Sequence, residues 1–448
     1  MFKLHVFQAE QGDCLLLEFG PRRSPRYILV DGGPSDVYEP HLRPYLQRLS
    51  EAGRTLERVV LSHIDGDHVG GLLEFLLDLQ VQRRLQPELR TLGVEGLWHN
   101  SFKESTGLPS DLRAALSDSA SGERSLLGAS PEEMVVIRSV PQGNRLRELA
   151  EALGIPANPD FGGGSILLDD ARPLRFGGLR LRVVGPTRAN LDELRDHWLE
   201  WYADQVQRVE AGVRGSPDTS VPNLSSIVLL ARAHGRSVLL TGDARDDHIL
   251  QGLAQAGLLD RDGRLHVSIL KAPHHASDRN HTPAFLNAVT ADTYVISANG
   301  MHGNPDPAVL RWIVEAAHAD GRPITLVLTN ETESVRNLVQ THDPARYGYT
   351  LRILPPGESF LTPPSTRWPA PSASCCRAAK RSQAAPAMGL ALPVWGARIA
   401  YVLQTPVLAG VRAAGTRSVQ DARRLQGRVA SSRWPGRGPR VDVPKLRT

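Results

Sequence analysis

One stretch of the chain decides its fold class: Ser62-His63-Ile64-Asp65-Gly66-Asp67-His68-Val69-Gly70-Gly71. It places four side chains that can bind a metal within six residues, at the spacing His-x-Asp-x-Asp-His. The apolar run before it predicts a strand, and the pattern after it predicts a helix over residues 69–79. We therefore expect one or two divalent cations at the carboxyl end of a strand.

A simpler explanation of this stretch is a turn. The sequence Asp65-Gly66-Asp67 is typical of turns, and Asp67 can cap the helix that follows. A turn needs neither His63 nor His68, so the two imidazoles favour the metal site.

Two later strands end in similar side chains. Leu239-Leu240-Thr241-Gly242-Asp243-Ala244 delivers one carboxylate just before a helix, where Asp is also a common cap. Leu270-Lys271-Ala272-Pro273-His274-His275-Ala276-Ser277 delivers two imidazoles. Adjacent histidines that leave a strand point in different directions, so we expect one to bind metal and the other to support a ligand or contact the substrate. Capping alone does not account for three such strand ends.

The rest of residues 1–360 predicts a mixed α/β architecture. The runs 2–7, 14–19 and 27–30 read as antiparallel strands, and from residue 226 to residue 354 strands alternate with helices. This order predicts two sheets with helices on both outer faces, a four-layer αββα sandwich. Residues 80–211 are less regular and suggest a helical insertion over the site.

Charge divides the chain near residue 360. Of 52 Lys+Arg and 48 Asp+Glu, residues 361–448 hold 15 and 2, which leaves 37 and 46 for residues 1–360. The second part is rich in Pro, Ala and Arg without the apolar period of packed elements, so we expect a disordered basic tail. It either binds an acidic partner or has no role. Pro393, Arg398 and Pro406 interrupt its apolar stretch 388–411, which argues against a transmembrane segment.

The cysteines and the N-terminus indicate a compartment. Cys14, Cys375 and Cys376 are too few for a disulfide framework in a chain of this size. Residues 2–7 alternate like a strand and do not resemble a signal peptide. A cytoplasmic location is expected.

The ordered motifs now support a resemblance. Together they resemble the metallo-β-lactamase superfamily, and more narrowly the branch with the metallo-hydrolase domain of the ComEC DNA-uptake proteins. The motifs, which cover residues 1 to about 310 with gaps, are Gln11-Gly12-Asp13, Asp31-Gly-Gly, Ser-His63-x-Asp65-x-Asp67-His68-x-Gly-Gly, Asn223-x-Ser225-Ser226, Leu-Leu-Thr-Gly-Asp243 and Lys-x-Pro-His274-His275-x-Ser277. The resemblance implies that His63 and Asp65 bind one metal, that Asp67 and His68 bind a second, that Asp243 bridges them, and that His274 completes the second site.

Three departures from the family pattern limit this transfer. Asp65 stands where the wider superfamily has His, a change shared with the ComEC-like branch that makes the site richer in oxygen and more tolerant of Mn²⁺ or Mg²⁺. The resemblance therefore implies Zn²⁺ or Mn²⁺ rather than zinc alone. A further histidine of the superfamily has no clear match in this chain. His99 is the candidate for that position, although a structural role for His99 is favoured. Where the ComEC-like branch has Gly-His-Pro, this chain has Gly303-Asn304-Pro305. Either His302 takes the role of that histidine, or the role is lost.

These residues lead us to expect a metal-dependent hydrolase. A cation would lower the pKa of a bound water to near ~7, with Asp67 and Asp243 orienting the resulting hydroxide. His275 would act on the substrate or the leaving group. The candidate substrate contacts are Asn223, Ser226 and His302.

The substrate class is less constrained. Two cations suit a phosphodiester, because both the attacking and the leaving oxygen can be bound. The acidic body argues against long duplex DNA, so the favoured substrate is a short or single-stranded nucleic acid or a nucleotide. A carboxylic ester or lactone hydrolase is one alternative. Another is a degenerate member of a multi-gene system, such as phage defence, that binds without turnover; Asn304 favours it, and the clustered carboxylates disfavour it.

Overall fold

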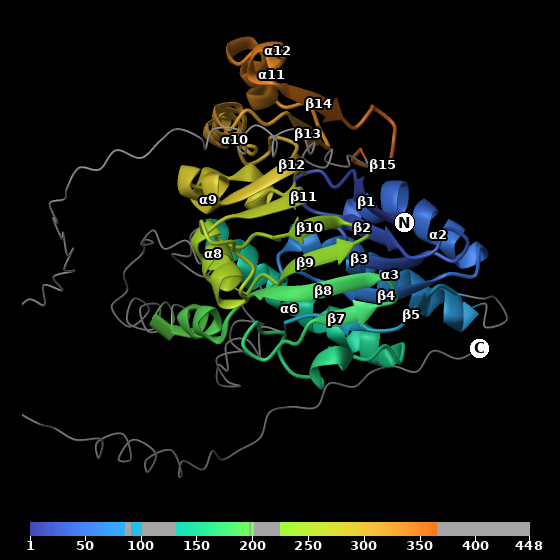
Figure 1. The fold of residues 1–448 in the computed structure, drawn as a ribbon. Helices are drawn as coiled ribbons and strands as arrows, with labels where there is room; N and C mark the ends of the chain where they lie inside the picture. Colours follow the sequence, from blue (N-terminus) through green and yellow to red (C-terminus); the bar gives the residue numbers. More distant parts are fainter. Residues whose placement is uncertain (86–90, 101–130, 197–198, 201–224, 365–448) are drawn as a thin grey trace, which may run out of the picture. The chain divides into compact units, whose positions relative to one another are not determined.

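The computed structural model describes residues 1–85, 91–100, 131–196, 199–200 and 225–364. The chain divides into two compact units, Met1–Ala370 and Pro371–Thr448, and the described residues all belong to the first. Two sheets run through this unit (Figure 1). In the described residues, no helix is long and apolar enough to cross a membrane. The apolar stretch 388–411 lies outside them.

The first sheet begins antiparallel and continues parallel. Its strand order is β15-β1-β2-β3-β4-β5, and β6 also pairs with β4. Pairing is antiparallel from β15 to β3 and parallel from β3 onward. The strands are β1 (Phe2–Phe7), β2 (Leu15–Phe19), β3 (Arg26–Val30), β4 (Thr55–Val60), β5 (Gly93–Val94), β6 (Leu97–Trp98) and β15 (Phe360–Leu361).

The second sheet follows the chain in order from β7 to β14. Its first four strands are antiparallel, and pairing is parallel from β10 onward. The carboxyl ends of β10 to β14 therefore meet at one edge. The strands are β7 (Leu174–Phe176), β8 (Leu179–Gly185), β9 (Val228–Ala233), β10 (Arg236–Leu240), β11 (Leu265–Lys271), β12 (Val289–Ile296), β13 (Ile324–Leu328) and β14 (Tyr349–Ile353).

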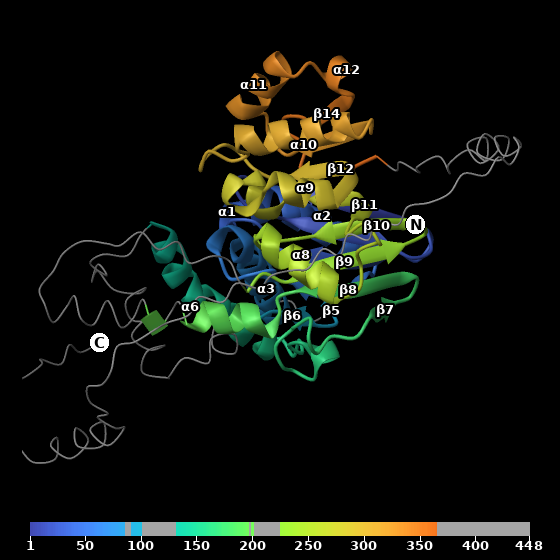
Figure 2. The ribbon, with the colours of Figure 1, turned by 60° about the vertical axis from the view of Figure 1, so that its left-hand side comes forward.

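Helices cover the outer face of each sheet (Figure 2). Against the first sheet pack α2 (Arg43–Glu51), α3 (Gly66–Leu85) and α6 (Pro131–Ala152), with α1 (Ser35–Val37) and the π-helical turn η1 (Tyr38–Leu42) leading into α2. Against the second sheet pack α8 (Asp246–Gln255), α9 (Pro283–Ala288), α10 (Pro307–Ala319) and α11 (Glu333–Thr341). The short α12 (Pro344–Tyr347) precedes β14.

The apolar core has three parts that match these layers. One cluster fills the space between the sheets, and each of the other two lies between a sheet and its helices. In β2, Leu15 and Leu17 face the second sheet while Leu16 faces the helices, so all five residues of this strand are buried. Each fully buried Leu contributes roughly 1.5–3 kcal/mol of transfer free energy. The predicted four-layer αββα sandwich is confirmed.

The structure differs from the sequence expectation in the region 80–211. Its described residues supply β5 and β6 to the first sheet and β7 and β8 to the second, so these strands belong to the sandwich itself. The helix α6 lies here as well, beside α3. Strand β15 places Leu361, which the charge pattern groups with the tail, in the first sheet.

Candidate metal centre

Three strand ends converge on the carboxylate of Asp243. Asp243 follows β10, His63 and His68 follow β4, and His274 and His275 follow β11. Because these strands lie in facing sheets, their loops meet at one edge of the sandwich. With Asp65 and Asp67, these residues form what we call the His/Asp cluster.

Each of the four imidazoles in the cluster directs its Nε2 atom at Asp243. From Oδ1 of Asp243, Nε2 of His68 is 3.5 Å away. From Oδ2, the Nε2 atoms of His63, His274 and His275 are 3.6, 3.7 and 3.5 Å away. Asp243 is therefore the common neighbour of all four rings.

The other ring nitrogen, Nδ1, is held by an oxygen outside the cluster. The Nδ1 atom of His68 lies 3.0 Å from Oδ2 of Asp31. That of His275 lies 2.9 Å from the backbone oxygen of Ser297. The remaining two contacts are those of His274 with Oδ1 of Asn280 at 2.7 Å and of His63 with Oγ of Ser62 at 3.0 Å.

These outer contacts fix the tautomer of the rings. A carboxylate or carbonyl oxygen only accepts, so Nδ1 of His68 and of His275 carries the hydrogen. The hydroxyl of Ser62 donates to Asp31 and must accept from His63. In each neutral ring the Nε2 lone pair then points inward, as in metal-binding histidines oriented by an outer oxygen.

Unsatisfied polar atoms mark the centre of the cluster. The buried atoms Nε2 of His63, His68 and His275 and Oδ1 of Asp243 have no hydrogen-bond partner. Buried polar atoms are rarely left without one, and each costs about 1–3 kcal/mol when it is. Inward-facing imidazole lone pairs around a carboxylate fit a divalent cation.

The donor atoms fall into two overlapping sets. One set is His63, His68 and Asp243, and the other is Asp67, His68 and His275; within each, the ligand atoms lie within 4.8 Å of one another. The carboxylate of Asp65 is 3.6 Å from Nε2 of His63, and that of Asp67 is 3.6 Å from Nε2 of His275. The arrangement can hold one cation in either set; because His68 has one free lone pair, two cations side by side would divide the donors, with His63, Asp65 and Asp243 around one and Asp67, His68 and His275 around the other.

Charges in the cluster lower the pKa of its central carboxylate and raise the pKa of two of its imidazoles. Burial alone would raise the pKa of Asp243, but the surrounding imidazoles, led by His275 and His68, hold it well below its usual range. Burial would likewise lower the pKa of His68, but Asp243, Asp67 and Asp31 raise it well above the ordinary value. The same carboxylate, Asp243, raises the pKa of His275. The cluster therefore attracts positive charge strongly.

An unusual backbone places the two neighbouring histidines on the same carboxylate. His274, His275 and Ala276 all have left-handed φ angles, of 44°, 54° and 66°. Such angles cost of order 1–3 kcal/mol each for residues other than glycine, and strain of this kind gathers at functional sites. From an ordinary strand exit, adjacent side chains diverge, and the sequence predicts only one ligand from this pair. In the structure both rings reach Asp243.

A close backbone crossing brings the Gln11-Gly12-Asp13 motif to the cluster. A side-chain carbon on Gly12 would lie 1.8 Å from the backbone oxygen of Asp67, so only glycine fits. The amide of Asp13 donates to that same oxygen at 3.3 Å. The side chain of Asp13 consequently lies beside His275, with Oδ1 3.7 Å from Nδ1.

Asp13 and Asp31 join the candidate ligand sets although the sequence assigned neither a role. Asp13 groups with Asp243 and His275, and both Asp13 and Asp31 group with His68. Their motifs, Gln-Gly-Asp and Asp-Gly-Gly, were visible as part of the resemblance. A buried carboxylate next to glycines that permit a close backbone approach was the available signal.

Of the predicted substrate contacts, one is buried, one is exposed, and one lies outside the described residues. Ser226 is buried near Gly242, and its Oγ atom has no hydrogen-bond partner. His302 is exposed, and no hydrogen bond or ion pair within the described residues joins it to the cluster. Its neighbour Asn304 donates to the backbone oxygen of His274 at 3.4 Å. Asn223 lies outside the described residues.

His99 lies in the core beside the cluster loop. It follows β6, is 2% exposed, and has no hydrogen-bond partner on either ring nitrogen. A side-chain carbon on Gly143 would meet both its ring and Ile64. Burial, with a smaller contribution from Arg147, lowers the pKa of His99 to about 3. It belongs to none of the candidate ligand sets found in the described residues.

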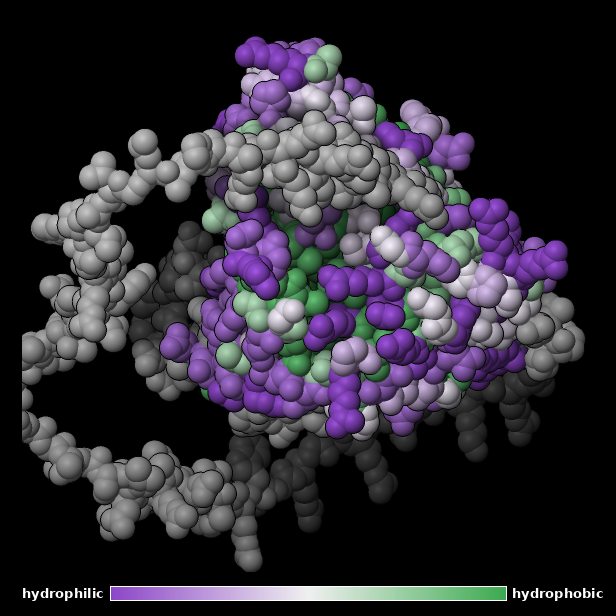
Figure 3. Space-filling model, in the orientation of Figure 1, coloured by the Kyte–Doolittle hydropathy of each residue, from purple (hydrophilic) through white to green (hydrophobic). Residues whose placement is uncertain are grey.

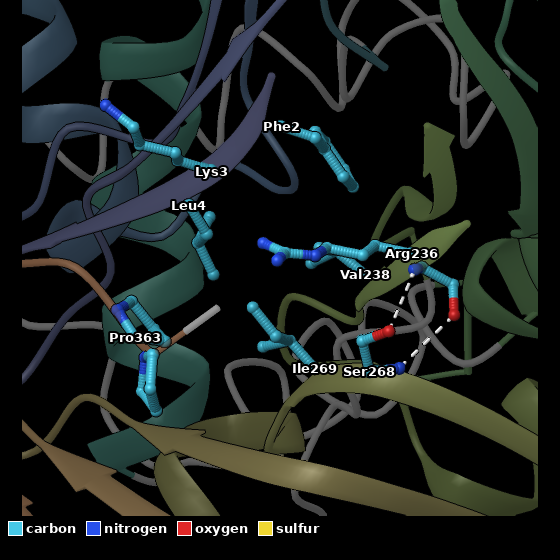
Figure 4. A pocket seen from close by; sticks show the side chains of 10 residues that line it. Phe2, Lys3, Leu4, Arg236, Val238, Ser268, Ile269 and Pro363 are labelled. Atoms are coloured by element: carbon cyan, nitrogen blue, oxygen red, sulfur yellow. Dashed lines mark hydrogen bonds between the residues drawn. The ribbon is translucent and has the colours of Figure 1, made fainter. Parts of the chain in front are cut away.

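The surface shows a separate hollow. On the face seen in Figure 1, apolar residues gather in a depression among hydrophilic ones (Figure 3). A pocket lined by residues from β1, β10 and β11, including Phe2, Leu4, Val238 and Ile269, holds no member of the His/Asp cluster (Figure 4). Ser237 and Ser268 bind each other's backbone amides there at 3.2 Å.

Comparisons with known proteins find a family likeness for one part of the chain. No curated protein matches the chain. Among solved structures, it is similar to the crystal structure of a metallo-beta-lactamase from Staphylococcus aureus subsp. aureus COL, with 11% sequence identity, a TM-score of 0.26, and coverage of 78% of this chain and 98% of that chain. Residues 9–166, which include the His63 to His68 segment, match the family model described as Metallo-beta-lactamase superfamily. Over residues 9–166, the chain is therefore similar to the metallo-beta-lactamase superfamily.

Proposed function

We propose that the protein is a hydrolase that uses two divalent cations, Mn²⁺ or Zn²⁺, to cleave a phosphodiester. The observation that carries this proposal is the inward orientation of four Nε2 atoms around Asp243. When bound there, a divalent cation supplies Lewis acidity, which makes water a better nucleophile and neutralises charge that develops on the substrate. The motifs shared with the ComEC-like branch support the same substrate class.

The balance of charge favours two cations. The carboxylates around the cluster are the buried Asp13, Asp31, Asp65 and Asp243 and the partly exposed Asp67, and Lys271 is the buried ammonium beside them. Their formal net charge is −4, which two divalent cations would neutralise. Unbalanced buried charge is costly, so a single cation would leave the pocket strongly negative and hostile to an anionic substrate.

The two neighbouring histidines suit different roles. The side chain of His275 is 5% exposed and belongs to the candidate ligand sets, whereas that of His274 is 33% exposed. We assign His275 to a cation and His274 to the substrate, where its ring can hold or deliver a proton at the leaving oxygen. The sequence interpretation gave these roles the other way round. Asp67, with 23% of its side chain exposed, lies on the same open side.

Reporter hydrolysis by the metal-loaded full chain tests this proposal. We expect turnover of bis(p-nitrophenyl) phosphate with Mn²⁺ or Zn²⁺, and little turnover of p-nitrophenyl acetate. The variant Asp243→Asn should lose both bound metal and turnover. Asp246→Asn is the matched control, because Asp246 is a buried carboxylate three residues away that bonds Thr282.

Each result separates the alternatives. Ester turnover without phosphodiester turnover would identify a carboxylic ester or lactone hydrolase. A protein that binds metal but cleaves neither reporter would point to a binding role in a multi-gene system. If wild type takes up no divalent ion, or Asp243→Asn retains metal and activity, the assignment of the site is wrong.

A further inference from the structure

A buried ion pair lies directly behind the His/Asp cluster. The ammonium of Lys271 is 2.5 Å from Oδ2 of Asp13, and both side chains are almost completely buried. Lys271 also donates to the backbone oxygen of Ala272 at 2.9 Å. A buried ion pair of this kind adds little net stability compared with apolar side chains of the same volume. Stability alone therefore does not explain why the pair lies beside the cluster.

The pair is connected to His275 from two directions. Oδ1 of Asp13 is 3.7 Å from Nδ1 of His275, on the side of the ring opposite the cluster. That same Nδ1 donates to the backbone oxygen of Ser297, whose hydroxyl donates to the backbone oxygen of Gly12 at 2.6 Å. The loop that carries Asp13 and the residue that orients His275 are thus one hydrogen-bonded unit.

The pair also joins the strand ends that build the cluster. The backbone oxygen of Lys271, the last residue of β11, accepts from the hydroxyl of Thr241, two residues before Asp243. The amide of Asp13 donates to the backbone oxygen of Asp67. A change in Lys271 therefore acts on the field at Asp243 and Asp67 without removing a candidate ligand, whereas a change in Asp13 also alters a member of the candidate ligand sets.

We propose that Asp13 and Lys271 form a positioning pair, in which Asp13 anchors the loop that binds Ser297, the residue that orients His275, and Lys271 serves as a fixed monovalent cation that sets how strongly the cluster binds divalent ions. The inference rests on the proposed function, because it requires the cluster to hold cations. When the charge of Asp13 is removed, the ammonium of Lys271 is left unpaired behind His275, and it repels a cation at the cluster. When the charge of Lys271 is removed, the carboxylate of Asp13 is left unpaired, and it attracts a cation.

The opposite changes in metal affinity expected for the two substitutions distinguish this role from a purely structural one. A pair that only held the fold together would make both single substitutions weaken metal binding. A pair that sets charge makes Asp13→Asn weaken binding, by roughly 10–100-fold as for other groups that support metal ligands, while Lys271→Met binds at least as tightly as wild type.

The experiment measures the dissociation constant for Mn²⁺ by calorimetry on the full, metal-stripped chain. The variants are Asp13→Asn, Lys271→Met and the combination of both, and the double variant also covers the case in which Lys271→Met does not fold. Relative to Asp13→Asn, the double variant should regain affinity, because it no longer carries the unpaired ammonium. Asp160→Asn is the control: it breaks the ion pair of Asp160 with Arg58, outside the cluster, and should leave Mn²⁺ affinity unchanged.

The outcomes are distinct from those of the proposed function. If wild type binds no Mn²⁺, the proposed function fails. If wild type binds Mn²⁺ but both single variants weaken binding alike, or the double variant binds no better than Asp13→Asn, the positioning pair is overturned and the proposed function stands.

Discussion

His68 and Asp31 form a buried imidazole–carboxylate pair, with Nδ1 of the ring 3.0 Å from Oδ2 of the carboxylate. Asp31 also accepts from the amide and the hydroxyl of Ser62, each at 2.7 Å. All three donors point at one carboxylate, so the ring of His68 can turn only one lone pair toward Asp243. The contact with Asp31 thereby fixes which nitrogen of the His68 ring is free to bind a cation.

Asp31→Asn should weaken divalent-metal binding by about 10–100-fold. The amide that replaces one carboxylate oxygen is a donor, so it faces the donors Ser62 and His68 and favours the opposite tautomer of the ring. The backbone of Asp31 has a φ of 57°, which Asn tolerates well, so the fold should persist. Calorimetric titration with Mn²⁺ measures the effect. Wild-type affinity in Asp31→Asn would show that this carboxylate does not orient His68.

The sequence predicted the convergence of strand ends because it followed from topology. Polar residues at the carboxyl ends of β4, β10 and β11 could be read from the apolar run before each of them. The alternation of strands and helices predicted for residues 226–354 includes helix α10 and strand β13, each of which has a strong period and clear ends.

Other parts of the site depend on contacts that no local pattern reveals. The left-handed backbone at His274 and His275 arises from tertiary packing, and neither residue favours it locally. The approach of Asp13 depends on how the loop after β1 crosses α3, which is a long-range contact. Helices α11 and α12 carry little signal in the sequence, because each is short and contributes few buried residues.

Gly12→Ala should destabilise the fold and the cluster together. The added methyl would lie 1.8 Å from the backbone oxygen of Asp67, which belongs to the first turn of α3, so loop or helix must move. Overpacking of this kind costs roughly 1–3 kcal/mol or more. Urea unfolding measures the loss, and Gly178→Ala is the control, because a methyl there meets no atom within 4 Å. Equal stability of the two variants would contradict the close crossing.

His275→Ala should reduce metal affinity more than His274→Ala. His275 is buried among Asp13, Asp67 and Asp243, whereas a third of the His274 side chain is exposed. We expect His275→Ala to lose bound metal, and His274→Ala to keep most of it while kcat falls by roughly 10²–10⁴-fold. Metal analysis and steady-state kinetics on the same preparations give both values. The reverse order would return the ligand role to His274.

His99 should make the free energy of unfolding depend on pH. Burial and Arg147 lower its pKa to about 3 in the folded chain, against an ordinary value of 6.5. As the pH falls below 6.5, the unfolded chain binds this proton and the folded chain does not, so stability present at neutral pH is lost, by roughly 2 kcal/mol at pH 5. His99→Leu removes this contribution and keeps a similar volume. Urea unfolding at pH 7 and at pH 5 should therefore show a drop for wild type that is about 2 kcal/mol larger than for the variant. Equal drops would mean that the ring of His99 takes up its proton in the folded protein as readily as in the unfolded one.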